Sequence, residues 1–416
     1  MILYMYIILW FCGNEETLDF SISDEQRELL SRLDEFCDMN LREDLVRRWY
    51  AEGGVPDSFM QSYYNEGFGL IGFPERMNGI PSSVLTRVLM LERLGLRAGA
   101  TLPMSSIMNY ANIVSSVAND QQMDEISSYF EKTGRPSFSF AISEPQAGSD
   151  SLNARTVAIE QEDGFVIRGT KSFVSFGQYA PYVVLIAHDV ALDDDIEVGR
   201  KPLTFFFLPS DSEGIDIIPI PKLSQNLIPS AEIIFNEVFV DASAVVGVRG
   251  EAARLLLNSF DYGRLYLCAT SIGMAQAAFN QAMVYATNRK TTNRTILSFQ
   301  QVQEMVVDMQ IKIDSMRSLL YKTAREFEDS SSEERRLNAA MLKRYVPRTA
   351  MEVADSAMQI LGSNGFMSTS LSARVWEESR GYRIAEGTDQ IMTVIAAKRI
   401  ARRSEFERSD PPVWRF

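Results

Sequence analysis

Apolar residues recur every three or four positions in the segment that follows Ser23, a candidate helix N-cap. The apolar positions are Leu29, Leu30, Leu33 and Phe36. This stripe is typical of a helix that packs one face against a core. Residues 56–64 and 82–96 show the same spacing, with Gly and Pro between them. We therefore expect residues 18–134 to form an N-terminal helical domain.

The hydrophobic pattern changes after residue 134, where β-branched and aromatic residues become frequent in short runs. A Glu-Asp-Gly turn at residues 162–164 joins two of these runs as a hairpin. The strand candidates are residues 156–161, 165–176, 182–187, 203–208, 215–220 and 231–240. We expect residues 135–246 to form a middle antiparallel β domain.

Helical spacing returns in long blocks beyond Arg249. The blocks are residues 251–289, 300–328, 333–361 and 389–403. Because long successive helices of this kind are typical of a bundle, we expect a C-terminal four-helix bundle over residues 247–404 and a tail over 405–416. The predicted fold class is α+β, with helical, β and helical parts in that order.

The composition narrows the classes of partner. The chain has 416 residues, more than one domain usually contains, and 46% of them are hydrophobic, which is enough for large cores. Lysine and arginine number 41 against 55 acidic residues, which gives a formal charge of −14. This balance argues against a nucleic-acid partner.

Cysteine and histidine usage argues against metal and disulfide chemistry. Cys12, Cys37 and Cys268 are far apart, and His188 is the single histidine. Zinc sites and disulfide frameworks use more numerous or more closely spaced ligands. We expect a reducing, cytoplasmic location, no bound metal, and a strand-end role for His188 rather than a catalytic one.

The first dozen residues are apolar but too few to span a bilayer, and no basic residue precedes Arg27, as a secretory signal would require. We therefore expect neither a membrane span nor a signal peptide. Two interpretations of residues 1–17 stay open. They lie upstream of a natural start at Leu18, or they form an apolar arm at a subunit contact.

Residues 141–150, Ala-Ile-Ser-Glu-Pro-Gln-Ala-Gly-Ser-Asp, follow a short apolar run and contain the first candidate site. Pro145 and Gly148 favour an irregular turn whose backbone N–H groups lack ladder partners. Ser143 and Ser149 add hydroxyls that both donate and accept hydrogen bonds. The turn suits an anion or the edge of a flavin, although taken alone an ordinary exit from a strand explains it better.

Four further segments follow this turn, at residues 171–177, 289–300, 359–366 and 384–390. Together the five segments resemble the acyl-CoA dehydrogenase family, from about Leu18 to about Arg403. The sequence Ser-Glu-Pro-x-Ala-Gly-Ser-Asp is close to a family signature, and Glu386-Gly387-Thr388 stands where the family's catalytic glutamate usually lies. The resemblance implies FAD between the β domain and the bundle. It also implies a homo-oligomer, a tetramer or a dimer, in which a neighbouring subunit completes the flavin site.

The resemblance further implies that Glu386 abstracts the α-proton of an acyl-CoA thioester while the β-hydrogen leaves as hydride to FAD. Such a weak acid yields its proton only if the enolate is stabilised and the base is desolvated. Taken alone, Glu386 reads as a solvated acid in the first turn of a helix, whose dipole would lower its pKa. The alternative position that some branches use for the base is Gly263 here, so Glu386 is the better candidate.

The remaining site residues are assigned from the same resemblance. Those expected to contact FAD are Ser143, Phe173, Ser175, Arg289, Gln300, Gln359, Gly362, Ser363, Thr388 and Gln390. Those expected to contact the substrate are Ser149, Asp261, Arg264 and Gly387. Judged from spacing alone, Asp261 and Arg264 form an i,i+3 ion pair on a helix surface, and Phe173 is an ordinary core aromatic.

The sequence also departs from the family pattern at four positions. These are Phe176 for a small polar residue, Thr292 for an aromatic, Ala385 for tyrosine and Glu377 for arginine. Such changes would reshape the pocket or weaken flavin retention, or mark a divergent branch. Residues 179–184 and 351–358 are similar to the carnitine-metabolism branch, whose members resemble crotonobetainyl-CoA reductase.

Three functions therefore compete. The first is an FAD-dependent acyl-CoA dehydrogenase that passes electrons to an electron-transferring flavoprotein. The second is the reverse activity, a 2-enoyl-CoA reductase within a flavoprotein complex, and the third is a non-catalytic relative that binds acyl-CoA. The presence of Glu386 argues against the third, whereas the sequence decides neither the direction of the reaction nor the acyl chain.

Overall fold

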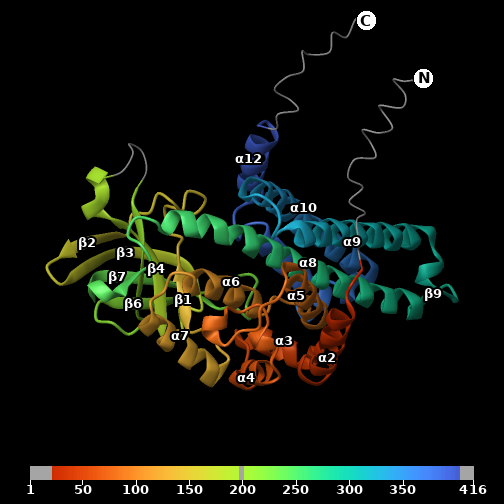
Figure 1. Ribbon diagram of the computed structural model, residues 1–416. Coiled ribbons are helices and arrows are strands. Elements are labelled where there is room, and N and C mark those ends of the chain that lie inside the picture. Colours follow the sequence, from red (N-terminus) through yellow and green to blue (C-terminus); the bar gives the residue numbers. More distant parts are fainter. Residues whose placement is uncertain (1–20, 196–200, 403–416) are drawn as a thin grey trace, which may run out of the picture.

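The computed structural model describes residues 21–195 and 201–402. The sequence predictions for the first 17 residues and for the C-terminal tail concern segments outside this range. Within it, helical, β and helical parts follow one another along the chain, as predicted. Figure 1 shows the sheet at one side of the molecule and the long C-terminal helices extending away from it.

Short helices with local caps make up the N-terminal part. They are α2 (Asp24–Asn40), α3 (Glu43–Glu52), α4 (Asp57–Asn65), α5 (Val84–Ala98), α6 (Met104–Ser115) and α7 (Asp120–Thr133). The predicted N-cap is confirmed, because the Ser23 hydroxyl accepts a hydrogen bond from the Gln26 backbone N–H at 3.2 Å. Leu30, Leu33 and Phe36 of the predicted stripe are buried, so α2 packs inward.

The middle part is an eight-stranded sheet within the described residues. Its strands are β1 (Phe138–Ala141), β2 (Val157–Gln161), β3 (Gly164–Ser175), β4 (Tyr182–Asp189), β5 (Leu203–Pro209), β6 (Ile215–Ile220), β7 (Ser230–Asp241) and β8 (Val245–Val246). The main path runs β6-β7-β3-β2-β4-β5-β8, and β1 pairs with β4. Most neighbours are antiparallel, as predicted, but β4 runs parallel to both β1 and β2.

The C-terminal part is built on long helices. They are α8 (Ala252–Asn288), α9 (Gln300–Glu326), α10 (Ser332–Leu361), α11 (Leu371–Tyr382) and α12 (Asp389–Ile400). A short hairpin of β9 (Lys290–Thr291) and β10 (Arg294–Thr295) joins α8 to α9 at the end farthest from the sheet (Figure 1).

Helix α11 was not predicted. Its buried face includes Arg374, Glu378 and Ser379 rather than an apolar stripe, so the hydrophobic spacing that reveals an amphipathic helix is missing. The buried polar groups find partners in other parts of the chain. Arg374, for example, donates hydrogen bonds to the carbonyls of Ala98 and Gly99 and to the Glu43 carboxylate.

The N-terminal helices, the bundle and one face of the sheet share one hydrophobic core, whereas the opposite face of the sheet has a core of its own. Helix α5 lies directly against α8, because Gly95 and Gly273 let the two backbones approach. A Cβ at Gly95 would meet the Thr270 carbonyl, and one at Gly273 would meet the Glu92 carbonyl. The two helical parts therefore form a single packed body beside the sheet.

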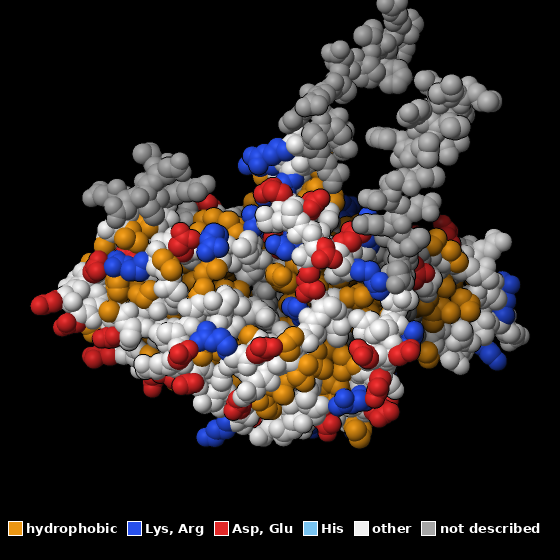
Figure 2. Space-filling model, viewed as in Figure 1, with side chains coloured by type: hydrophobic (Ala, Val, Ile, Leu, Met, Phe, Trp, Pro, Cys, Tyr) orange, Lys and Arg blue, Asp and Glu red, His pale blue; other side chains and the backbone are white. Residues whose placement is uncertain are grey.

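The surface carries no continuous area of one charge on the face that Figure 2 shows, where acidic and basic side chains are interspersed. Hydrophobic side chains gather on this face toward the end of the helices where β9 lies (Figure 2). Among the described residues, none of the helices combines the length and the apolarity that a membrane crossing requires.

Candidate active site

A cavity of about 520 Å³ lies where the sheet, α6, α8 and the turn between α11 and α12 meet. We call it the central cavity. Ser143, Ser149, Phe173 and Ser175 line it from the β domain, and Glu386 lines it from the turn before α12. Residues distant in the sequence thus face one space, and its volume is in the range of small-molecule sites.

The loop after β1 is fixed by a buried ion pair. Lys171 Nζ lies 2.8 Å from the Glu144 carboxylate, and both side chains are inaccessible to solvent. Glu144 also accepts hydrogen bonds from the backbone N–H groups of Arg155 and Thr156. Burial opposes the charge of Glu144, but Lys171 and these donors outweigh it and lower the pKa of the carboxyl. The loop that carries Ser143 is therefore rigidly anchored.

A bulge in β3 turns an aromatic ring into the central cavity. The pairing with β7 shifts between Lys171 and Val174, and Phe173 has a φ of 57°. Its side chain is 65% exposed and lines the cavity, so it is not an ordinary core aromatic. Phe176, by contrast, is buried outside the cavity lining, so this departure from the family pattern does not reshape the cavity wall.

Glu386 lies in a tight turn before α12, whose N-cap is Thr388. Glu386 has a φ of 56° and Gly387 one of 97°, conformations that disfavour most L-residues. Two cations hold the turn from behind. Arg264 Nε donates to the Glu386 carbonyl at 3.2 Å, and Lys343 Nζ donates to the Gly387 carbonyl. Lys343 was missed in the sequence, where it reads as an ordinary helix lysine, yet it is completely buried.

The Glu386 carboxylate is poorly solvated. Its Oε2 atom has no hydrogen-bond partner among the described residues. Burial raises the pKa of Glu386, and the attraction of Arg264 and Lys343 opposes the rise only in part. The expected lowering of the pKa by the helix dipole is therefore wrong. Glu386 precedes the N-cap of α12 instead of occupying its first turn, and its burial is the main cause of the raised pKa.

Asp261 and Arg264 form a buried pair, not a surface pair. Arg264 Nη1 lies 3.0 Å from Asp261 Oδ1, and each side chain is about 5% exposed. Arg264 lines the central cavity, whereas Asp261 lies behind it and also contacts Arg336 at 3.4 Å. Asp261 thus holds the guanidinium that in turn holds the Glu386 carbonyl.

Another buried carboxylate, that of Glu378, joins all three parts of the chain around the central cavity. Glu378 of α11 accepts hydrogen bonds from the Tyr50 hydroxyl at 2.9 Å, the Thr101 N–H at 3.1 Å and the Gln225 N–H at 2.6 Å. Thr101 and Gln225 themselves line the cavity. We call this cluster the Glu378 clamp. No spacing in the sequence revealed it, since its members are far apart along the chain.

The other predicted flavin contacts lie elsewhere. Arg289, Gln300, Gln359, Gly362 and Ser363 are exposed at the ends of α8, α9 and α10, at the β9 end of the bundle. We call this region the far end. None of them lines the central cavity, and neither do Thr388 and Gln390. Within one chain, the structure separates the first five residues from Glu386 and gathers them with one another, whereas Thr388 and Gln390 follow Glu386 closely at the start of α12.

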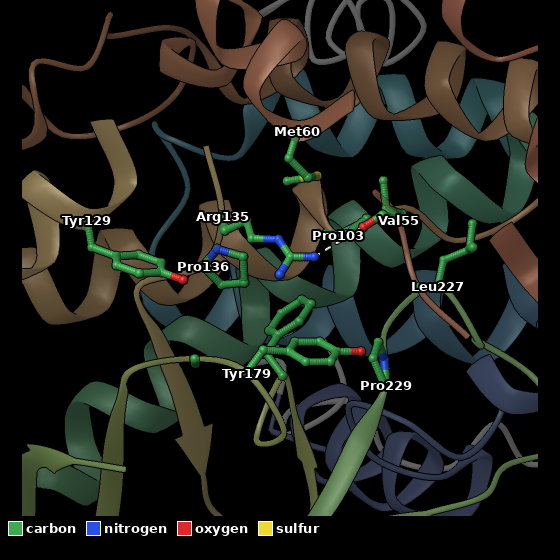
Figure 3. A pocket seen from close by; sticks show the side chains of 12 residues that line it. Val55, Met60, Pro103, Tyr129, Arg135, Pro136, Tyr179, Leu227 and Pro229 are labelled. Carbon is green, nitrogen blue, oxygen red and sulfur yellow. Dashed lines mark hydrogen bonds between the residues drawn. The ribbon is translucent and has the colours of Figure 1, made fainter. Parts of the chain in front are cut away.

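A smaller hollow between the N-terminal helices and the sheet is a packing feature (Figure 3). Arg135 donates a hydrogen bond to the Val55 carbonyl at 3.3 Å and lies over the Tyr179 ring, 5.4 Å from its centroid. The hollow holds about 30 Å³, space for little more than water. It therefore offers no room for an organic ligand.

Family comparisons cover most of the chain. Residues 23–127, 139–238 and 253–401 match the N-terminal, middle and C-terminal domains of acyl-CoA dehydrogenase. A curated relative from Escherichia coli K12, named "Probable acyl-CoA dehydrogenase YdiO", is 31% identical over 385 residues, which cover 92% of this chain and 99% of the relative.

Two solved structures share the whole fold. The acyl-CoA dehydrogenase of Slackia heliotrinireducens has 32% identity and a TM-score of 0.82, and the match covers 95% of this chain and all of that one. A chain from the structure of the electron transferring flavoprotein of Acidaminococcus fermentans has 26% identity and a TM-score of 0.83, with 92% of this chain and all of that one covered.

Proposed function

The chain belongs to the acyl-CoA dehydrogenase family of FAD-dependent oxidoreductases, and from that premise we propose that it converts an acyl-CoA thioester to the 2-enoyl-CoA. One observation carries the proposal. The poorly solvated carboxylate of Glu386 and the Ser143 and Ser149 loop line one cavity, which is large enough for an acyl group.

Glu386 acts as the base. Its desolvated carboxylate has a raised pKa, which brings its proton affinity closer to that of the weakly acidic α-carbon. The backbone N–H of Glu386 has no acceptor among the described residues. It is therefore available to donate to the thioester oxygen, where negative charge develops as the α-proton leaves. The carbonyl contacts of Arg264 and Lys343 keep this N–H and the carboxylate in one orientation.

The β-domain wall of the central cavity fits a flavin. Phe173 offers an exposed ring face, and Ser143 and Ser175 offer hydroxyls beside it. When bound there, FAD supplies the acceptor for the β-hydrogen and its electron pair. The chain's own residues position the acyl group, exclude water from Glu386 and hold the abstracted proton on its carboxylate.

The far end supports a homo-oligomer. Arg289, Gln300 and Gln359 are exposed there and do not line the central cavity of their own chain. We assign them, with Gly362 and Ser363, to the FAD of a neighbouring copy, whose pyrophosphate an arginine fork would suit. The cavity of each copy would then be completed by the far end of another.

The electron partner is part of the same proposal. We propose an electron-transferring flavoprotein as the partner. The support is that this chain shares its whole fold with a chain from the structure of the electron transferring flavoprotein of Acidaminococcus fermentans. The reverse activity, reduction of a 2-enoyl-CoA, would use the same residues, since the direction depends on the potential of the partner. The cytoplasmic location stays a prediction.

Replacement of the base tests the function. We expect Glu386→Gln to bind FAD as the parent protein does but to lose bleaching of the flavin by acyl-CoA about 10²–10⁴-fold, because a general base contributes that much. Flavin absorbance measures both properties in stopped flow with a panel of acyl-CoA esters. Glu25→Gln, an exposed glutamate of α2, is the matched control. Unchanged bleaching by Glu386→Gln would show that another base operates.

A further inference from the structure

An unpaired amide lies in the wall of the central cavity. Asn109 of α6 lines the cavity and is only 4% exposed, yet its side chain has no hydrogen-bond partner among the described residues. Asn112, one turn later on α6, shows the contrast. Its amide donates to the carbonyls of Gly72 and Met108 at 2.9 and 2.7 Å. Neither polar atom of the Asn109 amide is among the fully buried atoms that lack a partner, so the amide is open to the cavity. A ligand that covers it without a hydrogen bond would leave it unpaired, which is destabilising.

The amide lies beside the catalytic carboxylate. A Cβ on Gly263 would stand 2.8 Å from Asn109 Nδ2 and 3.2 Å from Glu386 Oε2, so the two groups flank one point above α8. Asn109 is therefore within reach of the next carbons of a substrate whose α-carbon meets Glu386. Ser105, one turn before Asn109 on the same face of α6, also lines the cavity and is 9% exposed.

The charges around this point restrict the group that Asn109 can receive. The charged residues that line the cavity are Asp150, Arg264 and Glu386. The Arg264 guanidinium is already engaged by Asp261 and the Glu386 carbonyl. An anionic group would be repelled by the Glu386 carboxylate, and among the described residues no free cation lines the cavity to balance it. A cationic group would form an ion pair with the base itself. An uncharged group that both donates and accepts hydrogen bonds fits best.

We propose that Asn109 and Ser105 form a polar subsite for an acyl group with an uncharged hydrogen-bonding substituent, such as a hydroxyl, on the carbon beyond the β-carbon. The inference rests on the proposed function and adds the class of substrate. A hydroxyl satisfies the buried amide, whereas a plain alkyl chain leaves it unpaired. Sites built to hydrogen-bond a substrate hydroxyl reject the analogue that lacks it far more strongly than apolar pockets discriminate by size.

A set of three CoA esters tests the subsite. 4-Hydroxybutanoyl-CoA and pentanoyl-CoA differ only in a hydroxyl against a methyl group, and 4-(trimethylammonio)butanoyl-CoA carries a cation at the same carbon. We expect kcat/KM, measured on the FAD-loaded protein with an artificial acceptor, to favour the hydroxy ester by about 100-fold or more. Asn109→Leu should reduce this preference to about tenfold or less, and Ser105→Ala should reduce it less.

The control and a second measurement keep the test decisive. Asn112→Leu alters an amide of the same helix outside the cavity, so its preference should equal that of the parent protein. Calorimetric titration measures the same preference as a ratio of affinities, without turnover. The two CoA esters with uncharged acyl groups are titrated into Glu386→Gln, with and without Asn109→Ala.

The outcomes separate the two proposals. If no CoA ester bleaches the flavin, the proposed function itself fails. If pentanoyl-CoA or the cationic ester reacts as well as the hydroxy ester, or if Asn109→Leu keeps the parent preference, the polar subsite is wrong while the dehydrogenase function stands.

Discussion

The central cavity and the far end of the bundle differ in the burial and pairing of their charged side chains. Around the cavity, two pairs of charged groups are buried, Glu144 with Lys171 and Asp261 with Arg264. At the far end, the Arg289 side chain is exposed and has no partner within the described residues. Hydrophobic side chains there, such as Val284 and Phe366, are 65% and 85% exposed.

The difference indicates where each region finds its partners. Buried charges require partners inside the same chain, because an unpaired buried charge is costly. Exposed arginine and hydrophobic side chains are available to bind a ligand or another protein surface. We infer that the cavity is organised within one chain and that the far end acts only when another copy is present.

After the base itself, the largest expected effect comes from the support behind Glu386. Lys343→Met keeps the length and apolar stem of the side chain but removes the donor to the Gly387 carbonyl. We expect kcat/KM to fall about 100-fold, because a base displaced from its productive geometry loses most of its advantage. Flavin content should stay unchanged. Lys322→Met, on the exposed face of α9, is the control, and equal rates for both variants would contradict the role of Lys343.

Removal of a far-end arginine should act on FAD affinity instead. We expect Arg289→Ala to weaken FAD binding about 10–100-fold, the size of a lost charge-assisted hydrogen bond, while the flavin-saturated rate changes little. Equilibrium titration of the apoprotein with FAD measures the affinity, and sedimentation reports the oligomer. FAD affinity equal to that of the parent protein would remove the assignment of the far end to the flavin.

The pH dependence of the rate tests whether burial raises the pKa of Glu386 in the working enzyme. Glu386 must be ionised to accept the α-proton, and its pKa is raised by burial. The rate should therefore fall as pH drops, about tenfold per unit, beginning above the ordinary glutamate pKa of about 4.3. The measurement is kcat/KM against pH. An acid limb at the ordinary value would show that the carboxylate is solvated during the reaction.

The smallest effect is expected from the Glu378 clamp, through stability. Glu378→Gln keeps the size of the side chain but loses its charge and one acceptor, so some of the donors that meet it are left unpaired. We expect a loss of about 1–3 kcal/mol, visible as a lower Tm in calorimetry. Glu377→Gln, its neighbour on α11, is the matched control. An unchanged Tm for Glu378→Gln would show that the clamp does not hold the three parts together.

The elements with regular spacing were predicted well. The stripe of α2 and the long blocks of α8, α9 and α10 appear in the structure close to their predicted bounds. The family and the three-part fold, recognised from motifs in order along the chain, are confirmed by the comparisons. Helix α11 was not predicted because its buried face is largely polar, whereas the spacing rules assume that buried faces are apolar.

The site residues divide in the same way. Motifs in the sequence pointed to Glu386, Ser143 and Ser149, and these face one cavity, although their roles stay proposals. Asn109 and Lys343 have no motif around them, and neither residue type suggests a site by itself.

The sequence by itself determined the family, the order of the parts and the identity of the candidate base, because these depend on residue types at fixed separations along the chain. Only the tertiary structure decided the environment of that base. Desolvation, the two cations behind the turn and the unpaired amide beside it come from groups on α6, α8 and α10, far apart in the sequence. The distance between such groups depends on packing, which linear spacing does not contain.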